Sequence, residues 1–398
     1  MSTDPLPRVF LLPGRDKRLR GGHPWVYSNE VRLDDESKAL APGAVVSLHR
    51  TDGKPLGVGT FNAHCLIAFR LFSTAPNTTL DSAFIEARLG RALALRQRLY
   101  DAPFYRLVHG EADGLPGLVV DRFGDTLVVQ TATAGTDALL PVILAALDAV
   151  VGPTAVVLRN DGAFRRLESL SETVAVVSGE VAPPIEIKQD GLIFVADPVG
   201  GQKTGWFFDQ RPNRAAVAAL VRDKESVLDA YCHSGAFAIA AAAQGASEVV
   251  GVDRSDPALD LARQTAERNG VAERCEFVRG DAFDELEKLA AVGRRFDVVF
   301  ADPPAFAKSR RDMKSGLKGY RKLARLAAPL VRAGGLLALS SCSHNVDGEA
   351  FSREVATGIA RSDRGARILR TGGAGPDHPV HPFLPESAYL KSLLMQLD

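Results

Sequence analysis

The chain has 398 residues, 46% of them apolar and 24% charged, as in a soluble globular protein too long for one ordinary domain. Its 48 basic and 48 acidic residues balance, which excludes a uniformly basic nucleic-acid-binding protein and confines any such site to a local patch. The N-terminus lacks the order of a signal peptide and no uncharged run suits a membrane span, so we expect a cytoplasmic protein.

The first 75 residues form short apolar runs separated by turns. Val45, Val46 and Leu48 precede the turn at 51–54, and a second apolar run follows it, which predicts a β-hairpin. We expect residues 1–75 to form a small β-barrel domain.

Residues 76–190 mix helical and strand patterns. Apolar residues recur at helical spacing over 81–100, and Asp81 is placed to cap that helix. A hairpin is expected over 185–197, with its turn at 189–191. These patterns predict an α+β middle domain.

The third region, 191–398, alternates strands with helices of 10–15 residues from about residue 212 onward. This rhythm is typical of βαβ units and a parallel sheet, so the fold class is α/β. The run at 388–397 predicts a final strand, antiparallel at the end of the sheet.

Polar residues end the predicted strands of this region. The strand ends are Asp229, Asp253, Asp281 and Asp302, and the last parallel strand ends beside Cys342. Because ligands bind at the carboxyl ends of such strands, we expect these side chains to line one site. Each acid alone could instead be a helix cap, and Cys342 alone could be a small buried residue.

The cofactor of this site follows from charge and glycine spacing. Only Gly235 lies in the loop after Asp229, so the G-x-G-x-x-G turn of a nicotinamide-dependent dehydrogenase is missing. An acidic edge would also repel phosphates, whereas S-adenosylmethionine carries a sulfonium and an ammonium. We expect Asp253 to accept from the ribose hydroxyls and Asp281 from the adenine amino group.

The loop after Asp302 suggests a substrate site. Pro303 and Pro304 stiffen the backbone, and loops of this type grip a planar group on a base in methyltransferases. The following stretch, 308–325, holds eight basic residues in 18, including Lys308, Arg310 and Arg311. It is either a solvated face or a track for nucleic-acid phosphates.

The chain resembles the bacterial 23S rRNA cytosine-5 methyltransferases, which are class I S-adenosylmethionine-dependent enzymes with an N-terminal PUA domain. The resemblance rests on KTGWFFDQRPNR (203–214), VLDAYCHSGAFAIAAAAQGASEVVGVDRS (227–255), FDVVFADPPAFAKS (296–309) and SSCS (340–343). It extends to GGHPWVYSNEV with GVGTFN near the N-terminus, GEADGLPGLVVDRFGD (110–125) and DHPVHPFLPESAYLK (377–391). It implies a PUA-like RNA-binding domain and a Rossmann-like methyltransferase domain.

The resemblance implies Cys342 as a nucleophile that adds to C6 of cytosine, with Asp302 holding the N3/N4 edge of the base. It implies further contacts near the cofactor from Gln210 and Arg211. The partner would be RNA, as 23S rRNA or a precursor of the large subunit, with no membrane and no metal; a homodimer stays open. Many RNA cytosine-5 methyltransferases place a second cysteine where this chain has Pro304, so another base must remove the C5 proton.

Two other functions stay open at this stage. A guanine N-methyltransferase acting on rRNA would use Asp302 and leave Cys342 a bystander. A non-catalytic RNA-binding assembly factor would keep the fold without the chemistry.

Overall fold

The computed structural model describes residues 6–398, which divide into two compact units. The first unit holds the chain up to Ala182, with Pro198–Thr204 and Asp377–Ser387. The second holds Pro183–Asp197, Gly205–Pro376 and Ala388–Asp398. No helix among residues 6–398 combines the length and hydrophobicity needed to cross a membrane.

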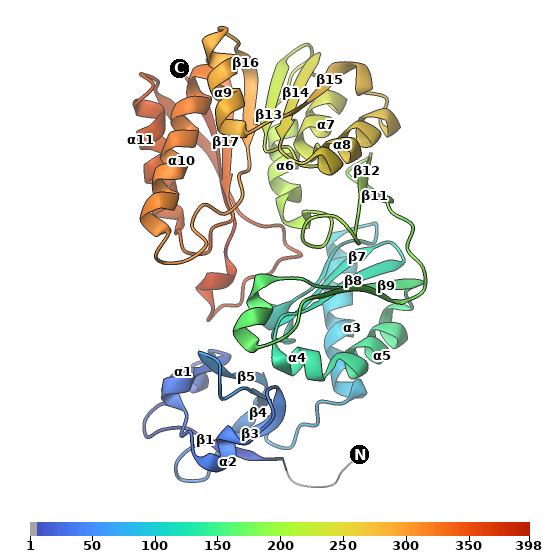
Figure 1. Cartoon of the computed structure of the whole chain (residues 1–398), viewed down its shortest axis with the longest axis vertical. Coiled ribbons are helices and arrows are strands. Elements are labelled where there is room, and N and C mark those ends of the chain that lie inside the picture. The colour runs from blue at the N-terminus through green and yellow to red at the C-terminus, as the bar shows by residue number, and fades with distance from the viewer. Residues whose placement is uncertain (1–5) are drawn as a thin grey trace. The chain divides into compact units, whose positions relative to one another are not determined.

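The first sheet of the N-terminal unit has five strands in the order β1-β3-β4-β5-β2 (Figure 1). β1 is parallel to β3, and the other pairs are antiparallel. The elements are β1 (Arg8–Phe10), α1 (Lys17–Arg20), β2 (Trp25–Tyr27), α2 (Asp35–Lys38), β3 (Ala44–His49), β4 (Pro55–Phe61) and β5 (Ile67–Ser73). The predicted hairpin is confirmed as β3 and β4, whose inward residues Leu48 and Phe61 are buried.

The second sheet of this unit has the order β10-β9-β8-β7-β6 and carries helices on one face. The elements are α3 (Ser82–Leu99), β6 (Phe104–His109), β7 (Leu118–Phe123), β8 (Thr126–Thr131), α4 (Ala134–Ala138), α5 (Leu140–Val151), β9 (Ala155–Asn160) and β10 (Thr173–Ser178). Asp81 caps α3 as predicted, because its carboxylate accepts the Phe84 N–H at 3.0 Å. Ile85 and Leu89 of α3 pack against Ile143 of α5 and the sheet.

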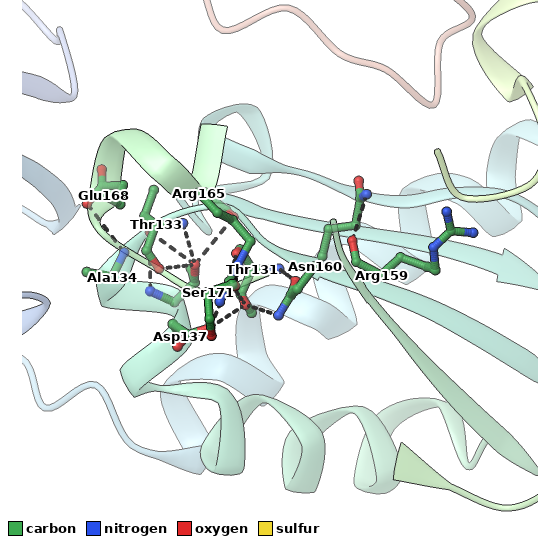
Figure 2. A network of polar contacts seen from close by, with 12 residues as sticks. Thr131, Thr133, Ala134, Asp137, Arg159, Asn160, Arg165, Glu168 and Ser171 are labelled. Carbon is green, nitrogen blue, oxygen red and sulfur yellow. Dashed lines mark hydrogen bonds and ion pairs between the residues drawn. The ribbon is translucent and has the colours of Figure 1, made fainter. Parts of the chain in front are cut away.

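A polar network fixes the loop after β9 to the end of the sheet (Figure 2). The Thr131 backbone N–H donates to the Asn160 side-chain oxygen at 2.8 Å. The Asn160 side-chain NH2 donates to the Thr131 hydroxyl, also at 2.8 Å. The Arg165 guanidinium reaches the Thr131 carbonyl at 2.5 Å and Asp137 at 2.8 Å. Beyond it, Glu168 accepts from Asn62 of the first sheet's β4–β5 connection at 3.0 Å. The two sheets of the unit are therefore joined by buried polar bonds as well as by apolar packing.

The second unit begins with the hairpin predicted over 185–197, confirmed as β11 (Ile185–Gln189) and β12 (Leu192–Ala196). Its large sheet has seven strands in the order β15-β14-β13-β16-β17-β19-β18. The elements are α6 (Arg211–Ala218), β13 (Ser226–Ala230), α7 (Ala236–Ala243), β14 (Glu248–Asp253), α8 (Asp256–Arg268), β15 (Cys275–Arg279), α9 (Ala282–Ala291), β16 (Phe296–Ala301), α10 (Met313–Ala327), β17 (Val331–Ser341), α11 (Gly348–Ala360), β18 (Ala366–Gly372) and β19 (Lys391–Leu397).

The first five strands of this sheet are parallel, as the alternating pattern predicts. Helices α9, α10 and α11 pack on one face, and α6, α7 and α8 lie on the other (Figure 1). The C-terminal strand β19 is antiparallel as predicted, but it lies inside the sheet, between β17 and β18. The edge strand β18 is exposed along most of its length, so its sequence lacks the apolar run by which strands are recognised.

The buried arginine of α3 offers a test of the N-terminal unit. Arg96 is fully buried, and its guanidinium bonds Asp113 at 2.5 and 2.8 Å and the carbonyls of Arg106 and Asp377 at 2.8 Å. Asp113→Ala leaves that charge without its carboxylate and should lower the free energy of unfolding by about 3–5 kcal/mol in urea denaturation. Glu172→Ala, which breaks an exposed pair with Arg166, is the control and should change nothing measurable. A loss below about 1 kcal/mol for Asp113→Ala would contradict this reading of the pair.

Candidate active site

The site lies where β13, β16 and β17 end side by side. In the parallel ladder Ala230 pairs with Ala301, and Ala301 pairs with Leu339. The strand order reverses between β13 and β16, which is where ligands bind in open α/β sheets. The loops after these strands carry Asp302 and Cys342, so the sheet brings these two predicted residues to one edge.

Asp229, at the end of β13, is buried with 1% of its surface exposed. One carboxylate oxygen accepts the Ala238 N–H of α7 at 3.0 Å, while Oδ1 has no hydrogen-bond partner within residues 6–398. Burial raises the pKa of this carboxyl well above its ordinary value, and the charges of Asp302 and Asp253 raise it further. A buried oxygen of this kind fits the ammonium group of S-adenosylmethionine, because an incoming cation would satisfy it.

The loop after β13 holds an unusual backbone. Tyr231 and His233 have φ of +63° and +49°, and Gly235 has +74°. Such conformations are costly for residues other than glycine and gather at ligand-binding loops. A Cβ on Gly235 would lie 3.0 Å from the Ala262 Cβ. Asp253 stabilises the loop by accepting the His233 N–H at 2.9 Å, so the predicted acid of β14 lies beside the predicted glycine loop.

Asp281, Gln210 and Arg211 have protein partners at this edge. Asp281 caps α9 through the Phe283 and Asp284 N–H groups and also pairs with Arg254. Arg211 pairs with Asp190 in the β11–β12 turn at 2.7 Å. The contacts that we predicted from these residues to the cofactor stay predictions.

Asp302 is held by the amide of Gln210, which is itself held by the amide of Asn213. The Gln210 amide donates to Asp302 Oδ2 at 2.8 Å, and its own oxygen accepts from Asn213 at 2.8 Å. Asn213 is in turn fixed by the Gly373 carbonyl at 2.9 Å. In the loop that follows, Pro303 is buried and Pro304 is exposed. Segment 205–214 thus reaches the strand edge, and its amide positions the acid next to the thiol strand.

Cys342 follows β17 and is partly exposed, whereas the hydroxyls on either side of it are buried. Ser341 donates to the Tyr320 hydroxyl at 2.8 Å, and that hydroxyl bonds Ser343 at 2.7 Å. Ser343 also accepts the Ala307 N–H of the loop after β16 at 3.2 Å. Ser341 and Ser343 are thus both bonded to Tyr320, and these bonds shape the loop that carries Cys342.

Burial disfavours the ionised form of the other three thiols. Cys65 and Cys232 are buried, whereas Cys275 is partly exposed, as Cys342 is. Burial raises the pKa of Cys65 to about 12 and that of Cys275 to about 11. The pKa of Cys232 is raised well above its ordinary value, again mainly by burial. None of the three suits a nucleophile, because the reactive form is the thiolate.

The basic stretch divides into two parts. In the C-terminal half of α10, Arg321 pairs with Glu354 at 2.5 Å and Lys322 with Glu287 at 3.6 Å, as on an ordinary solvated face. Before and early in α10 the basic residues are exposed, and within residues 6–398 they form no ion pair: Lys308, Arg310, Arg311, Lys314 and Lys318. The second set is available to an anionic ligand.

Three residues of the site were missed from the sequence. Asn213 and Tyr320 act through bonds to residues distant along the chain, which no spacing reveals. Lys391 lies opposite Ser341 in the β17–β19 ladder, and its amino group bonds the Ser343 carbonyl at 2.6 Å. It stands in the stretch 377–391 that carries the family resemblance, which was the one available signal.

Two protein-family models match this chain. A PUA-like domain matches residues 9–74, and an S-adenosylmethionine-dependent methyltransferase matches residues 156–394. Among solved structures, one described as a SAM-dependent methyltransferase from Streptococcus mutans has a TM-score of 0.82 at 20% identity, covering 98% of this chain and all of its own. A methyltransferase-like structure complexed with SAH has a TM-score of 0.84 at 21% identity, with the same coverage. The predicted fold class is thus confirmed.

Proteins with similar sequences match this chain over nearly its full length. Ribosomal RNA large subunit methyltransferase I of Cronobacter sakazakii is 36% identical over 389 residues, covering 96% of this chain and 98% of its own. The protein of the same name from Pseudoalteromonas atlantica is 32% identical over 394 residues, covering 98% and 99%. Together with the two matched domains and the strand edge described above, these matches place the chain in the ribosomal RNA large subunit methyltransferase I family of S-adenosylmethionine-dependent enzymes.

Proposed function

We propose that this methyltransferase acts on C5 of a cytosine in RNA, with 23S rRNA or a large-subunit precursor as its substrate. The observation that carries the proposal is the partly exposed Cys342 thiol at the end of β17, next to the strand that ends in Asp302. The names of the relatives support ribosomal RNA of the large subunit. The PUA-like domain supports an RNA substrate.

Cytosine C5 is a weak nucleophile until a group adds to C6. In the proposed reaction the Cys342 thiolate forms a bond to C6, and the ring electrons move to C5. S-adenosylmethionine, when bound, would supply an electrophilic methyl group to that carbon, and breaking of its sulfur–methyl bond would leave S-adenosylhomocysteine. A base then takes the C5 proton, and the electrons of that bond expel the sulfur as thiolate. Pro304 stands where a second cysteine would be, so this chain uses another group as the base.

We assign Asp302 to the N3/N4 edge of the cytosine. Gln210 holds one carboxylate oxygen at 2.8 Å, which supports a fixed orientation of the acid. An acid that shares a proton with N3 would neutralise the negative charge that the adduct places on the ring. Pro303 and Pro304 would line the base, because two successive prolines keep the loop rigid.

We assign Asp229, Gly235, Asp253 and Asp281 to the cofactor. The unpartnered Asp229 oxygen and the loop with positive φ support this assignment. Gln210 and Arg211, in segment 205–214, are the remaining residues that we assign to the cofactor. None of these carboxylates suits a pyrophosphate, which agrees with the missing glycine motif.

The RNA would be held by two regions. Lys308, Arg310 and Arg311 would contact phosphates beside the target base, which must leave its stack to reach a strand-end loop. The domain of residues 1–75 and the middle domain of residues 76–190 would hold the surrounding RNA, and residues 191–398 would perform the transfer. We propose a cytoplasmic enzyme, and sedimentation would decide between monomer and homodimer.

Substitution of the thiol tests the mechanism. Cys342→Ser should abolish methyl transfer to rRNA while binding of S-adenosylhomocysteine persists, because the serine hydroxyl is not ionised at neutral pH. Cys275→Ser, at another partly exposed cysteine, is the control and should leave methyl transfer unchanged. Retained transfer by Cys342→Ser would refute the adduct and favour a guanine N-methyltransferase, in which Asp302 alone handles the base.

The adduct itself can be captured. RNA containing 5-fluorocytidine cannot release a proton from C5, so the sulfur–C6 bond should persist after methyl transfer. We expect a denaturation-resistant protein–RNA complex that carries the RNA on the peptide containing Cys342, as read by mass spectrometry. RNA with unmodified cytidine is the control. Absence of a covalent complex with an active enzyme would contradict the proposed chemistry.

The tyrosine that bridges two serines tests how the thiol loop is positioned. Tyr320→Phe removes the hydroxyl that bonds Ser341 and Ser343, leaving both without that partner. We expect a loss of about 1–3 kcal/mol in stability and a fall in kcat greater than any rise in KM. Tyr105→Phe removes a hydroxyl with only a 3.4 Å contact to Arg122 in the N-terminal unit and should keep kcat unchanged. A Tyr320→Phe enzyme with the original kcat would show that the network is dispensable.

The exposed basic residues can be tested by salt dependence. Replacing Lys308, Arg310 and Arg311 by alanine should weaken RNA binding and lower the slope of log K against log salt by about 2, since each phosphate contact contributes about 0.7. Arg353→Ala on α11, which breaks an exposed pair with Glu349, should leave the slope unchanged. An unchanged slope in the triple variant would place the RNA elsewhere.

A further inference from the structure

The thiol of Cys342 needs a positive charge nearby if it is to react as a thiolate at neutral pH. An ordinary cysteine with a pKa of about 8.5 is only a few per cent ionised at pH 7. The hydroxyls of Ser341 and Ser343 cannot supply the missing stabilisation, because both are bonded to Tyr320. The proposed function leaves the source of that stabilisation open.

The sheet places Lys391 beside the backbone segment that carries the thiol. It pairs with Ser341 across the β17–β19 ladder, one residue before Cys342. Its ammonium donates to the Ser343 carbonyl at 2.6 Å and to the Tyr389 carbonyl at 2.7 Å. These two carbonyls flank the amino group from both strands, so it is fixed beside the backbone that carries the thiol.

The segment that carries Lys391 is itself anchored. The Tyr389 hydroxyl bonds Asp209 at 2.5 Å, and its ring stacks on His344 with centroids 5.0 Å apart. The aliphatic part of Lys391 lies against the N-terminus of α11, where a Cβ on Gly348 would be 3.8 Å from the Lys391 Cγ. A long and usually mobile side chain is therefore restrained at both its base and its tip.

The charged and titratable groups around this amino group are few. Cys342 and Asp347 interact with it electrostatically, and Tyr320, His344 and Tyr389 are the titratable groups of the adjoining elements. Asp347 is exposed and caps α11 through the Ala350 N–H, so its charge is shared with that helix end and with water. Of the two groups that interact electrostatically with Lys391, Cys342 is partly buried and Asp347 is exposed.

The interaction between the two groups is mutual. Burial lowers the pKa of Lys391 to about 8, and the charge of a Cys342 thiolate raises it. Because a pairwise interaction has the same free energy for both partners, the ammonium favours the thiolate form of Cys342 in turn. With a pKa of about 8 the amine is still mostly protonated at pH 7, so the charge is present when the enzyme works.

We infer that Lys391 is a positioning residue whose ammonium stabilises the thiolate form of Cys342. This inference rests on the proposed nucleophile. In this inference a residue of β19 activates the thiol at the end of β17. None of the residues predicted for the site from the sequence lies in β19.

Alkylation of the full-length protein without RNA tests the inference directly. The rate at which iodoacetamide modifies Cys342 is followed against pH, by mass spectrometry of the peptide that contains it. Lys391→Met, which keeps the length and loses the charge, should slow alkylation at pH 7 about tenfold and move the profile up by about one pH unit. Lys391→Arg, which keeps the charge, should stay within about threefold of the original rate. Cys275 in the same samples serves as an internal control and should be unaffected.

The outcomes separate this inference from the proposed function. If Cys342→Ser is inactive in methyl transfer but Lys391→Met leaves the alkylation profile unchanged, the nucleophile stands and the role of Lys391 is refuted. If Lys391→Arg behaves like Lys391→Met while both bind S-adenosylhomocysteine normally, the effect is one of packing and the inference also fails. If Cys342→Ser keeps its methyl-transfer activity, the proposed function is refuted, and the inference about Lys391 is refuted with it. Methyl transfer by Lys391→Met should fall with the alkylation rate at pH 7 and recover toward higher pH, where the thiol ionises unaided.

Discussion

The Tyr320 hydroxyl and the two serines that it bonds hold the loops after β16 and β17 together at one edge of the sheet. Tyr320 lies on α10, Ser341 ends β17, and Ser343, two residues later, accepts the Ala307 N–H from the loop after β16. Loops tend to move unless their polar groups are satisfied, and here the groups of two loops satisfy each other in a buried site. Cys342, between the serines, is thereby held on the exposed side of a fixed turn.

Charge at this edge is divided between two sides. The strand ends β13, β14 and β16 carry Asp229, Asp253 and Asp302, whereas Lys391 stands on the far side of β17. The acidic side suits a cationic cofactor, and the basic side favours an anionic sulfur. In our proposal one site therefore holds a cationic cofactor on its acidic side and an anionic sulfur on its basic side. The acidic side would also repel the phosphates of a dinucleotide cofactor.

Much of this was predictable from the sequence, and the failures have physical causes. The parallel strands, the cap at Asp81 and both hairpins follow from local periodicity and turn chemistry. The exposed edge strand β18 has no such periodicity, and the interior position of β19 depends on a partner that follows no short-range rule. Asp377 belongs to the N-terminal unit, where it accepts the Arg106 N–H at 2.9 Å. Composition cannot show that a segment so late in the chain completes the first unit.

At the candidate site, the sequence could identify the residues to which we assign the chemistry but not those that surround and position them. Acids at strand ends and a lone thiol are visible because parallel strands share an edge. The position of Lys391 could not be predicted in this way, because it begins an antiparallel strand. It lies at this edge only because the β17–β19 register pairs it with Ser341. A register shift of one residue would turn its side chain to the other face of the sheet. The buried run of β19, Ser392 to Met395, fixes that register by packing in the core, so hydrophobic burial at the end of the chain determines on which face of the sheet the Lys391 side chain lies.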